Sequence, residues 1–387
     1  MTAPRLDMDR LIDDRRTRII VCCGSGGVGK TTAAAAIGLR AAERGRHACV
    51  LTVDPARRLA QSMGLTSLDN TPRQVDGVDT VDGGSLHAMM LDMKRTFDEI
   101  VEAHADPDRA AQILVNPFYQ SLSSSFAGTQ EYMAMEKLGQ LRHADEWDLI
   151  VVDTPPSRSA LDFLDAPQRL GRFLDGRLIR LLTAPARTGM SAMRVLNAGF
   201  AMMTGALTKL LGAQVLKDAQ TFVTALDTMF GGFRERAETT YRLLQTPGTA
   251  FLVVAAPEPD ALREASYFVE RLDAERMPLA GLILNRVHTS PAGRLSAARS
   301  LAAAETLDMQ DKPNGPGSDA PRYSIAAAAL RMHAERMHLS KRERRLAEHF
   351  TSAHPAIPVA EVSAQPEDVH DLDGLRVIGT ILSRQGS

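Results

Sequence analysis

Uninterrupted apolar runs recur along the chain, separated by segments with helical character. Val21 to Cys23 and Phe251 to Ala255 are examples in which apolar residues follow one another without a polar residue between them. Such runs are typical of parallel strands that are covered on both faces, since a half-exposed strand would alternate apolar and polar positions. The pattern predicts strands at 18–23, 47–53, 85–91, 148–153, 249–255, 279–287 and near 357–359.

The segments between the strands favour helices, and two regions break the alternation. An Ala-rich helix is expected at 30–44, where Gly45 marks its end. We expect region 166–247 to be helical with no strand, and 309–321 to form a Pro/Gly-rich loop before a charged helix at 322–350. We therefore predict an α/β fold, a doubly wound, mostly parallel sheet with a helical subdomain. The expected divisions are 1–165 and 248–387 for the two halves of the core and 166–247 for the inserted subdomain.

A Gly-rich segment between the first strand and the first long helix carries the clearest chemistry. Gly24, four further residues, Gly29, Lys30 and Thr31 fit the phosphate-binding P-loop pattern at every position. Glycines let backbone N–H groups turn toward phosphate oxygens, and the helix that follows adds its positive end. Lys30 would reach the β- and γ-phosphates, and the Thr31 hydroxyl would bind Mg²⁺. The expected nucleotide-binding residues of the loop are Gly24, Ser25, Gly26, Gly27, Val28, Gly29, Lys30, Thr31 and Thr32.

The same glycines also satisfy a dinucleotide-binding fingerprint, with Asp54 as a downstream acidic residue. Two features favour the P-loop over this alternative. The loop continues into Lys30 and Thr31, which a pyrophosphate-binding turn does not require. A later strand ends in Asp153, where a nucleoside triphosphatase places a carboxylate on the Mg²⁺ side.

Composition narrows the class of protein further. The 387 residues carry a net charge of −2, and aromatic residues make up only 5%, so nothing indicates a nucleic-acid partner. The polar segment 1–18 does not resemble a signal peptide. Cys22, Cys23 and Cys49 lie in predicted strands and form no CxxC pair. We expect them to be core thiols in a reducing cytoplasm, with no zinc bound.

The predicted helical subdomain is rich in methionine. The stretch 195–216 contains Asn197, Lys209 and Gln214, which argues against a membrane span. Methionines on helices commonly fill gaps in a core, and Met-rich surfaces also adapt to varied apolar partners. Both interpretations stay open for Met190, Met193, Met202, Met203 and Met229.

Three motifs together resemble the ArsA-type ATPases. They are the P-loop itself, Thr-Val-Asp-Pro-Ala at 52–56 and Val-Asp-Thr-Pro-Pro at 152–156. That family includes the arsenite-pump ATPase and the eukaryotic ATPase that targets tail-anchored membrane proteins. The chain is most similar to actinobacterial members that occur as paired subunits, and the resemblance covers residues 18–382. It implies a P-loop fold of the SIMIBI type.

The resemblance also implies roles for individual residues. Lys30 and Asp54 would be catalytic, with Asp54 positioning the attacking water, although a helix N-cap would also explain Asp54. Thr31, Asp54 and Asp153 would hold Mg²⁺, the carboxylates through water. Asn285 would read adenine with an amide that both donates and accepts, although a turn residue at the strand end is an alternative explanation. Glu258 would contact the nucleotide.

Departures from the family pattern are informative as well. Members usually carry a signature lysine, which reaches the nucleotide of the opposite subunit, at the position of Ser25. A short neutral serine cannot supply that charge, and losing such a cation costs orders of magnitude in rate. Arg57 or Arg58 is a candidate replacement. The zinc-binding CxxC of the tail-anchored-protein targeting ATPase is missing, so its zinc-held homodimer is not supported. A heterodimer with a related subunit is favoured, with a homodimer as the alternative.

The sequence therefore predicts a cytoplasmic, Mg²⁺-dependent ATPase. ATP would drive a dimer rearrangement that controls a surface for a hydrophobic client or a membrane-protein partner, which could bring the protein to the membrane periphery. Two alternatives remain. One is a catalytically weakened subunit that regulates a paired ATPase, and the other is a ParA/MinD-like positioning ATPase.

Overall fold

The protein is described here from a computed structural model. It describes residues 3–53, 58–79, 83–116, 119–120, 123, 130–155, 235–236, 238–310 and 324–384. Nearly all of the predicted helical subdomain at 166–247, with its methionines, lies outside these residues. What the sequence predicts about that subdomain stays a prediction.

A single sheet of eight strands forms the centre of the described fold, in the order β3-β4-β2-β5-β1-β6-β7-β8. Every neighbouring pair is parallel except β3 and β4, which are antiparallel at one edge. The strands are β1 (Ile19–Cys23), β2 (His47–Thr52), β3 (Arg73–Gln74), β4 (Ser85–Met90), β5 (Leu149–Asp153), β6 (Thr249–Ala255), β7 (Leu279–Val287) and β8 (Val359–Ser363). Because β1 lies between β5 and β6, its carboxyl end opens at the middle of the sheet.

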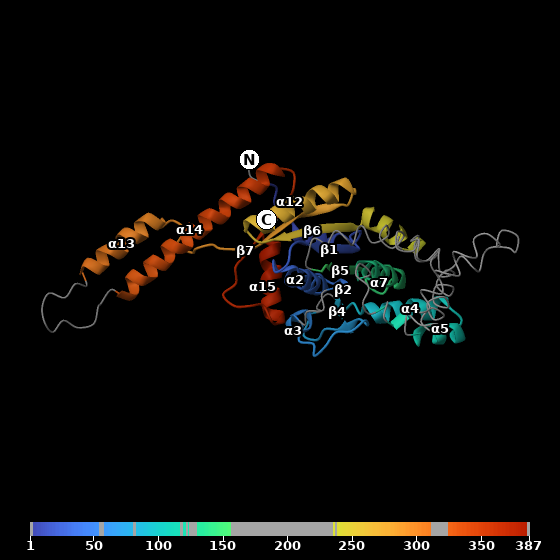
Figure 1. Cartoon of the computed structure of the whole chain (residues 1–387). Coiled ribbons are helices and arrows are strands. Elements are labelled where there is room, and N and C mark those ends of the chain that lie inside the picture. Colours follow the sequence, from blue (N-terminus) through green and yellow to red (C-terminus); the bar gives the residue numbers. More distant parts are fainter. Residues whose placement is uncertain are drawn as a thin grey trace, which may run out of the picture.

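Helices cover both faces of this sheet, as Figure 1 shows. Residues of α1, α2, α3 and α15 pack in the core of one face, and those of α4, α5, α7, α12 and the end of α14 in the core of the other. The helices are α1 (Met8–Asp13), α2 (Lys30–Glu43), α3 (Arg58–Ser62), α4 (Met93–His104), α5 (Pro107–Leu114), α7 (Gln130–Ala144), α12 (Pro259–Ala274), α13 (Ala297–Gln310), α14 (Ser324–Ala353) and α15 (Leu372–Ser383). The predicted doubly wound α/β fold is confirmed.

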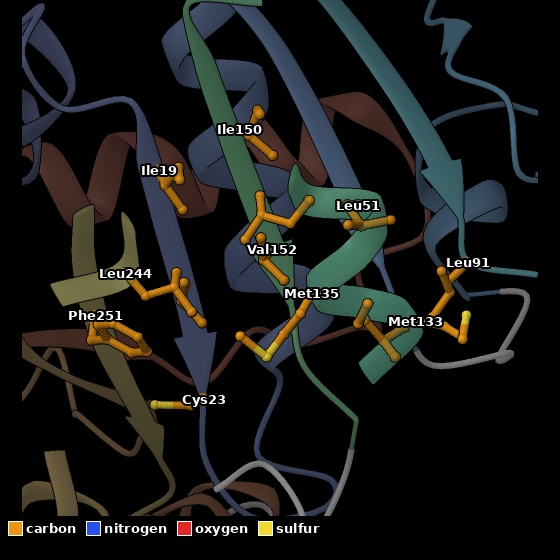
Figure 2. Packing of buried hydrophobic residues seen from close by; sticks show 14 of the residues in the cluster. Ile19, Cys23, Leu51, Leu91, Met133, Met135, Ile150, Val152, Leu244 and Phe251 are labelled. Atoms are coloured by element: carbon orange, nitrogen blue, oxygen red, sulfur yellow. The ribbon is translucent and has the colours of Figure 1, made fainter. Parts of the chain in front are cut away.

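Alternating side chains of the central strand enter two separate cores. Ile19, Val21 and Cys23 of β1 face one core, while Ile20 and Cys22 face the other. Figure 2 shows the first core, where helix α7 packs its methionines over β1, β2 and β5. All three cysteines of the chain are buried and unbridged, as the sequence predicts.

The N-terminal segment is held to the sheet by a buried arginine. Arg46, only 1% exposed, lies just before β2 and donates to the Asp148 carboxylate over 2.6 Å. Its other nitrogens donate to the backbone carbonyls of Ile12 (2.5 Å) and Thr17 (2.7 Å). Helix α1 itself begins at an Asp7 side chain that accepts from the Arg10 N–H. One guanidinium thus joins the segment after α1 to the start of β5.

Helices α13 and α14 pack along each other and extend away from the sheet (Figure 1). Helix α13 continues to Gln310, two residues into the predicted loop at 309–321, and the rest of that loop lies outside the described residues. At the base of this hairpin, the buried Glu343 side chain accepts from the His288 backbone N–H over 2.8 Å. None of the helices among the described residues combines the length and the apolar character needed to cross a bilayer.

Candidate nucleotide-binding site

The Gly-rich loop runs from the carboxyl end of β1 into α2 and uses backbone conformations that suit glycine. Gly24, Gly27 and Gly29 have φ angles of 149°, 76° and 94°. A Cβ atom on Gly24 would lie 2.1 Å from the carbonyl oxygen of Val254 in the neighbouring strand β6. The loop therefore lies against the sheet too closely for any side chain at its first glycine, which is what a phosphate cradle requires.

Lys30 is the first residue of α2, and its side chain folds back over the loop. Its Nζ donates to the backbone carbonyl of Ser25 over 2.8 Å, and the residue is 5% exposed. The ammonium group thus lies against the backbone of the Gly-rich loop. Thr32 follows in the first turn of α2 and is half-buried.

Thr31 and Asp153 meet where β1 and β5 end side by side. The Thr31 hydroxyl donates to Asp153 Oδ2 over 2.7 Å, and the Thr52 hydroxyl at the end of β2 donates to the same oxygen over 2.9 Å. Asp153 is fully buried. Burial, and after it the nearby Asp153 charge, raises the pKa of the Cys22 thiol well above its usual value. The sequence named Thr31 and Asp153, and the structure brings them together.

Asn285, near the end of β7, contacts the same loop. Its Nδ2 donates to the carbonyl of Val28 over 2.8 Å, and its Oδ1 accepts from the N–H of Arg286 over 2.9 Å. A Cβ on Gly29 would lie 2.3 Å from Asn285 Nδ2, so glycine is required there too. A primary amide keeps a second proton and a second lone pair beyond these two contacts, and the contact with adenine stays a prediction.

A pocket of about 620 Å³ opens beside the loop. Residues 25–28 of the loop line it, together with Glu258 and Arg286 among others. Glu258, for which the sequence predicts a nucleotide contact, is the exposed N-cap residue of α12. No group of three or more His, Cys, Asp or Glu side chains suited to a metal ion occurs within the described ranges.

Some predicted site residues cannot be compared with the structure. Asp54 and Arg57 lie outside the described residues, and of Arg58 only its place as the first residue of α3 is described. Sequence reasoning gave no role to Thr52 or Arg286. Thr52 belongs to the motif at 52–56 and lies two positions before Asp54. Its place at the end of a predicted strand was the signal that could have assigned it to the site. Arg286 had no signal beyond its place next to Asn285.

This strand–loop–helix, with a buried carboxylate at the end of the adjacent strand, defines a P-loop nucleoside triphosphatase fold. Within that class the chain belongs to the ArsA family: the family model described as "Anion-transporting ATPase" matches residues 17–308. The family resemblance expected from the three motifs is therefore confirmed. Helix α14, strand β8 and helix α15 lie beyond the matched range.

Individual relatives are distant. Over 167 positions, this chain is 27% identical to an ATPase GET3 of Malassezia globosa. The matched segment covers 43% of this chain and 47% of the relative. The chain thus spans about half the length of that relative, and the same holds for an ATPase GET3 of Ajellomyces dermatitidis. Longer matches are those to an ATPase GET3 of Podospora anserina (22% identity, 72% of this chain, 76% of the relative) and an ATPase ASNA1 homolog of Babesia bovis (23%, 73% and 70%).

Proposed function

We propose that this protein binds ATP with Mg²⁺ and hydrolyses it to ADP and phosphate. The observation that carries the proposal is the arrangement of Lys30, Thr31 and Asp153 around a loop whose glycines leave its backbone accessible. Family membership supports the same activity. The loop N–H groups and the Lys30 ammonium would hold the phosphates, as in other P-loops.

The donor set fits a hard cation. The Thr31 hydroxyl and the Asp153 carboxylate are oxygen donors 2.7 Å apart, and Mg²⁺ prefers oxygen ligands with several waters retained. When bound, the ion would neutralise charge that develops on the phosphates. Thr52 would keep the Asp153 carboxylate oriented, because its hydroxyl already donates to Oδ2.

Asp54 is proposed as the residue that positions the attacking water. It follows the end of β2 by two positions, and β2 pairs with β5 so that Thr52 lies next to Asp153 in register. This register supports a place for Asp54 at the same edge of the sheet. Exchange of its carboxylate for an amide in Asp54→Asn is expected to preserve ATP binding and to remove most turnover.

We further propose that the protein works with a related subunit and handles a hydrophobic segment or membrane-protein client. The relatives called ATPase GET3 and ATPase ASNA1 homolog, and the sequence resemblance to tail-anchored-protein targeting, support the client. Ser25 supports the partner, because it leaves this P-loop without the cation that family members direct across a dimer interface. The Met-rich region 166–247 is the proposed client surface.

Ser25 also favours a second candidate function, that of a weakly catalytic subunit that regulates a paired ATPase. The two candidates differ in one measurement, the hydrolysis rate of the purified chain with and without the related subunit. Slow hydrolysis that rises on adding the partner supports the first. The second is supported if this chain stimulates hydrolysis by the partner, and if this chain shows no turnover of its own when it is paired with a catalytically inactive variant of the partner.

Isothermal titration with a non-hydrolysable ATP analogue tests the binding step. Lys30→Ala is expected to lose most of the affinity, and omission of Mg²⁺ is expected to weaken binding by the wild type. Lys94→Ala is the matched control, because Lys94 lies on α4 and pairs with Asp98 over 2.6 Å. Equal affinities of Lys30→Ala and Lys94→Ala would contradict the P-loop assignment, and tight binding of NAD would restore the dinucleotide alternative.

A further inference from the structure

Arg286 has a backbone conformation that is unusual for an arginine. It follows Asn285 near the end of β7, is exposed, and has a φ of 62°. Among the described residues other than glycine, only Asp145 and Arg276 share a positive φ. A residue persists in such a sparsely populated region only where its surroundings determine it, and such residues gather at functional sites.

The backbone of Arg286 is linked to the P-loop through the side chain of Asn285. Its backbone N–H donates to Asn285 Oδ1 over 2.9 Å, and Nδ2 of the same amide donates to the Val28 carbonyl over 2.8 Å. The Asn285 amide also lies against Gly29, where a Cβ would approach it to 2.3 Å. One side chain therefore fixes the backbone of Arg286 relative to the phosphate-binding loop.

Arg286 lines the pocket of about 620 Å³ together with P-loop residues 25–28. The pocket also presents the carboxylates Glu258, Asp260 and Glu264, and Arg286 is the basic residue among those that line it. No hydrogen bond or ion pair joins its guanidinium to another residue in the described parts of the chain, whereas Asp260 pairs with Arg263 over 3.1 Å. Its charge is therefore available to a ligand of this pocket.

We infer that Arg286 is a nucleotide-binding residue that contacts the phosphate groups held by the P-loop. A guanidinium can donate two parallel hydrogen bonds to phosphate oxygens, and it stays charged at every physiological pH. The loop itself offers a neutral residue at Ser25, and Lys30 is directed to the Ser25 carbonyl. Arg286 thus supplies a second positive charge beside the loop from a different strand. This inference rests on the proposed nucleotide-binding function.

The test compares variants that tolerate the positive φ at position 286 at least as well as arginine does. Arg286→Gly removes the guanidinium and suits a positive φ, and Arg286→Lys keeps a charge without the planar fork. Arg276→Gly is the matched control, because Arg276 is also exposed with a φ of 56° but lies after α12 and does not line the pocket. Should Arg286→Gly fail to fold, Arg286→Asn replaces it, since asparagine also tolerates the left-handed region.

Two ligands are titrated in the presence of Mg²⁺, a non-hydrolysable ATP analogue and inorganic tripolyphosphate, which keeps the phosphates and lacks base and sugar. Arg286→Gly is expected to weaken both by about tenfold to a hundredfold, the range for losing a hydrogen bond to a charged group. Arg286→Lys should recover part of each loss, and Arg276→Gly should match the wild type.

Each other outcome overturns the inference in a distinct way. Affinities of Arg286→Gly equal to those of Arg276→Gly show that the arginine does not contact the ligand. Weaker nucleotide binding with unchanged tripolyphosphate binding assigns Arg286 to the base or sugar instead of the phosphates. If Lys30→Ala weakens both ligands while Arg286→Gly does not, the proposed function stands and only this inference fails. No binding by the wild type overturns both.

Discussion

Thr31 Oγ1 donates to Asp153 Oδ2 over 2.7 Å, although the two residues are 122 positions apart in the sequence. The contact exists because β1 and β5 are parallel neighbours that end at the same edge of the sheet. Thr52, from the next strand, donates to the same oxygen. Two hydroxyl groups thus meet one carboxylate, and only Thr31 belongs to the phosphate-binding loop.

This geometry predicts different effects for the two threonines. Thr31→Val removes a hydroxyl that would bind Mg²⁺, so the Mg²⁺ concentration for half-maximal ATP-analogue binding should rise by about tenfold or more. Thr31→Ser should stay close to the wild type. Thr52→Val removes a hydrogen bond to a buried carboxylate, which should lower the free energy of unfolding by about 1.5–3 kcal/mol with a smaller effect on Mg²⁺. Identical Mg²⁺ titrations of Thr31→Val and Thr52→Val would argue against Thr31 as a ligand.

The first and second glycines with positive φ in the P-loop should differ in tolerance. In Gly24→Ala the new Cβ would meet the Val254 carbonyl at 2.1 Å, so either the loop or β6 must move. We expect loss of ATP-analogue binding and a lower thermal midpoint. In Gly27→Ala the Cβ meets nothing within 4 Å, and only the positive φ is unfavourable, by about 1–2 kcal/mol. Thermal unfolding and ATP-analogue titration of both variants check that Gly27→Ala is the better tolerated. A more stable and tighter-binding Gly24→Ala would contradict the prediction.

Arg46 should contribute strongly to stability. Arg46→Met removes the buried guanidinium that donates to the Asp148 carboxylate and to the carbonyls of Ile12 and Thr17, so the free energy of unfolding should fall by about 3–5 kcal/mol. Arg15 pairs with the same Asp148 over 3.0 Å, but its side chain is 60% exposed. Arg15→Met should therefore change stability by about 0–1 kcal/mol. Urea unfolding of the two variants measures the difference. Equal effects would show that the buried Arg46 contacts do not stabilise the fold more than the exposed Arg15 pair does.

The thiols should become reactive only at high pH. Burial raises the pKa of Cys23 and of Cys49 to about 12, and that of Cys22 also lies well above its usual value. A folded pKa above that of the unfolded thiol favours folding below the unfolded value, about 8.5. That contribution is lost as pH rises through the folded pKa, so stability should decline from about pH 8.5 upward. Iodoacetamide at pH 8 should label all three cysteines in urea and none in the native protein, as mass spectrometry can show.

Much of the fold was readable because buried parallel strands leave continuous apolar runs. Strands β6 and β7 have the predicted bounds, Thr249–Ala255 and Leu279–Val287, since each is long and strongly apolar. Strand β8 starts at Val359, at the end of its predicted position. It lies at the edge of the sheet and its residues alternate between buried and exposed, as at Glu361, so it has no continuous apolar run. The two-residue β3 was missed, as Arg73 and Gln74 are exposed and carry no apolar pattern.

Some site residues could be predicted from a local sequence motif, and others depend on contacts between distant parts of the chain. Lys30 and Thr31 could be assigned from spacing alone, because the P-loop is continuous in sequence. The contact of Asn285 with Val28 could be named only by resemblance, since no local rule places the end of β7 beside the loop. Arg286 has no sequence signal beyond its place next to Asn285. Its inferred role rests on a backbone angle and on a pocket that exist only in the folded chain.

Asn285 and Val28 are 257 positions apart, and this separation has a consequence for synthesis on the ribosome. At about 5–20 residues per second, the loop is made on the order of ten to fifty seconds before the strand that braces it. Strand β6, against which Gly24 packs, is also made late. A nascent chain therefore carries a complete P-loop motif well before the strands that brace it exist. The proposed nucleotide site forms only once the C-terminal half has emerged.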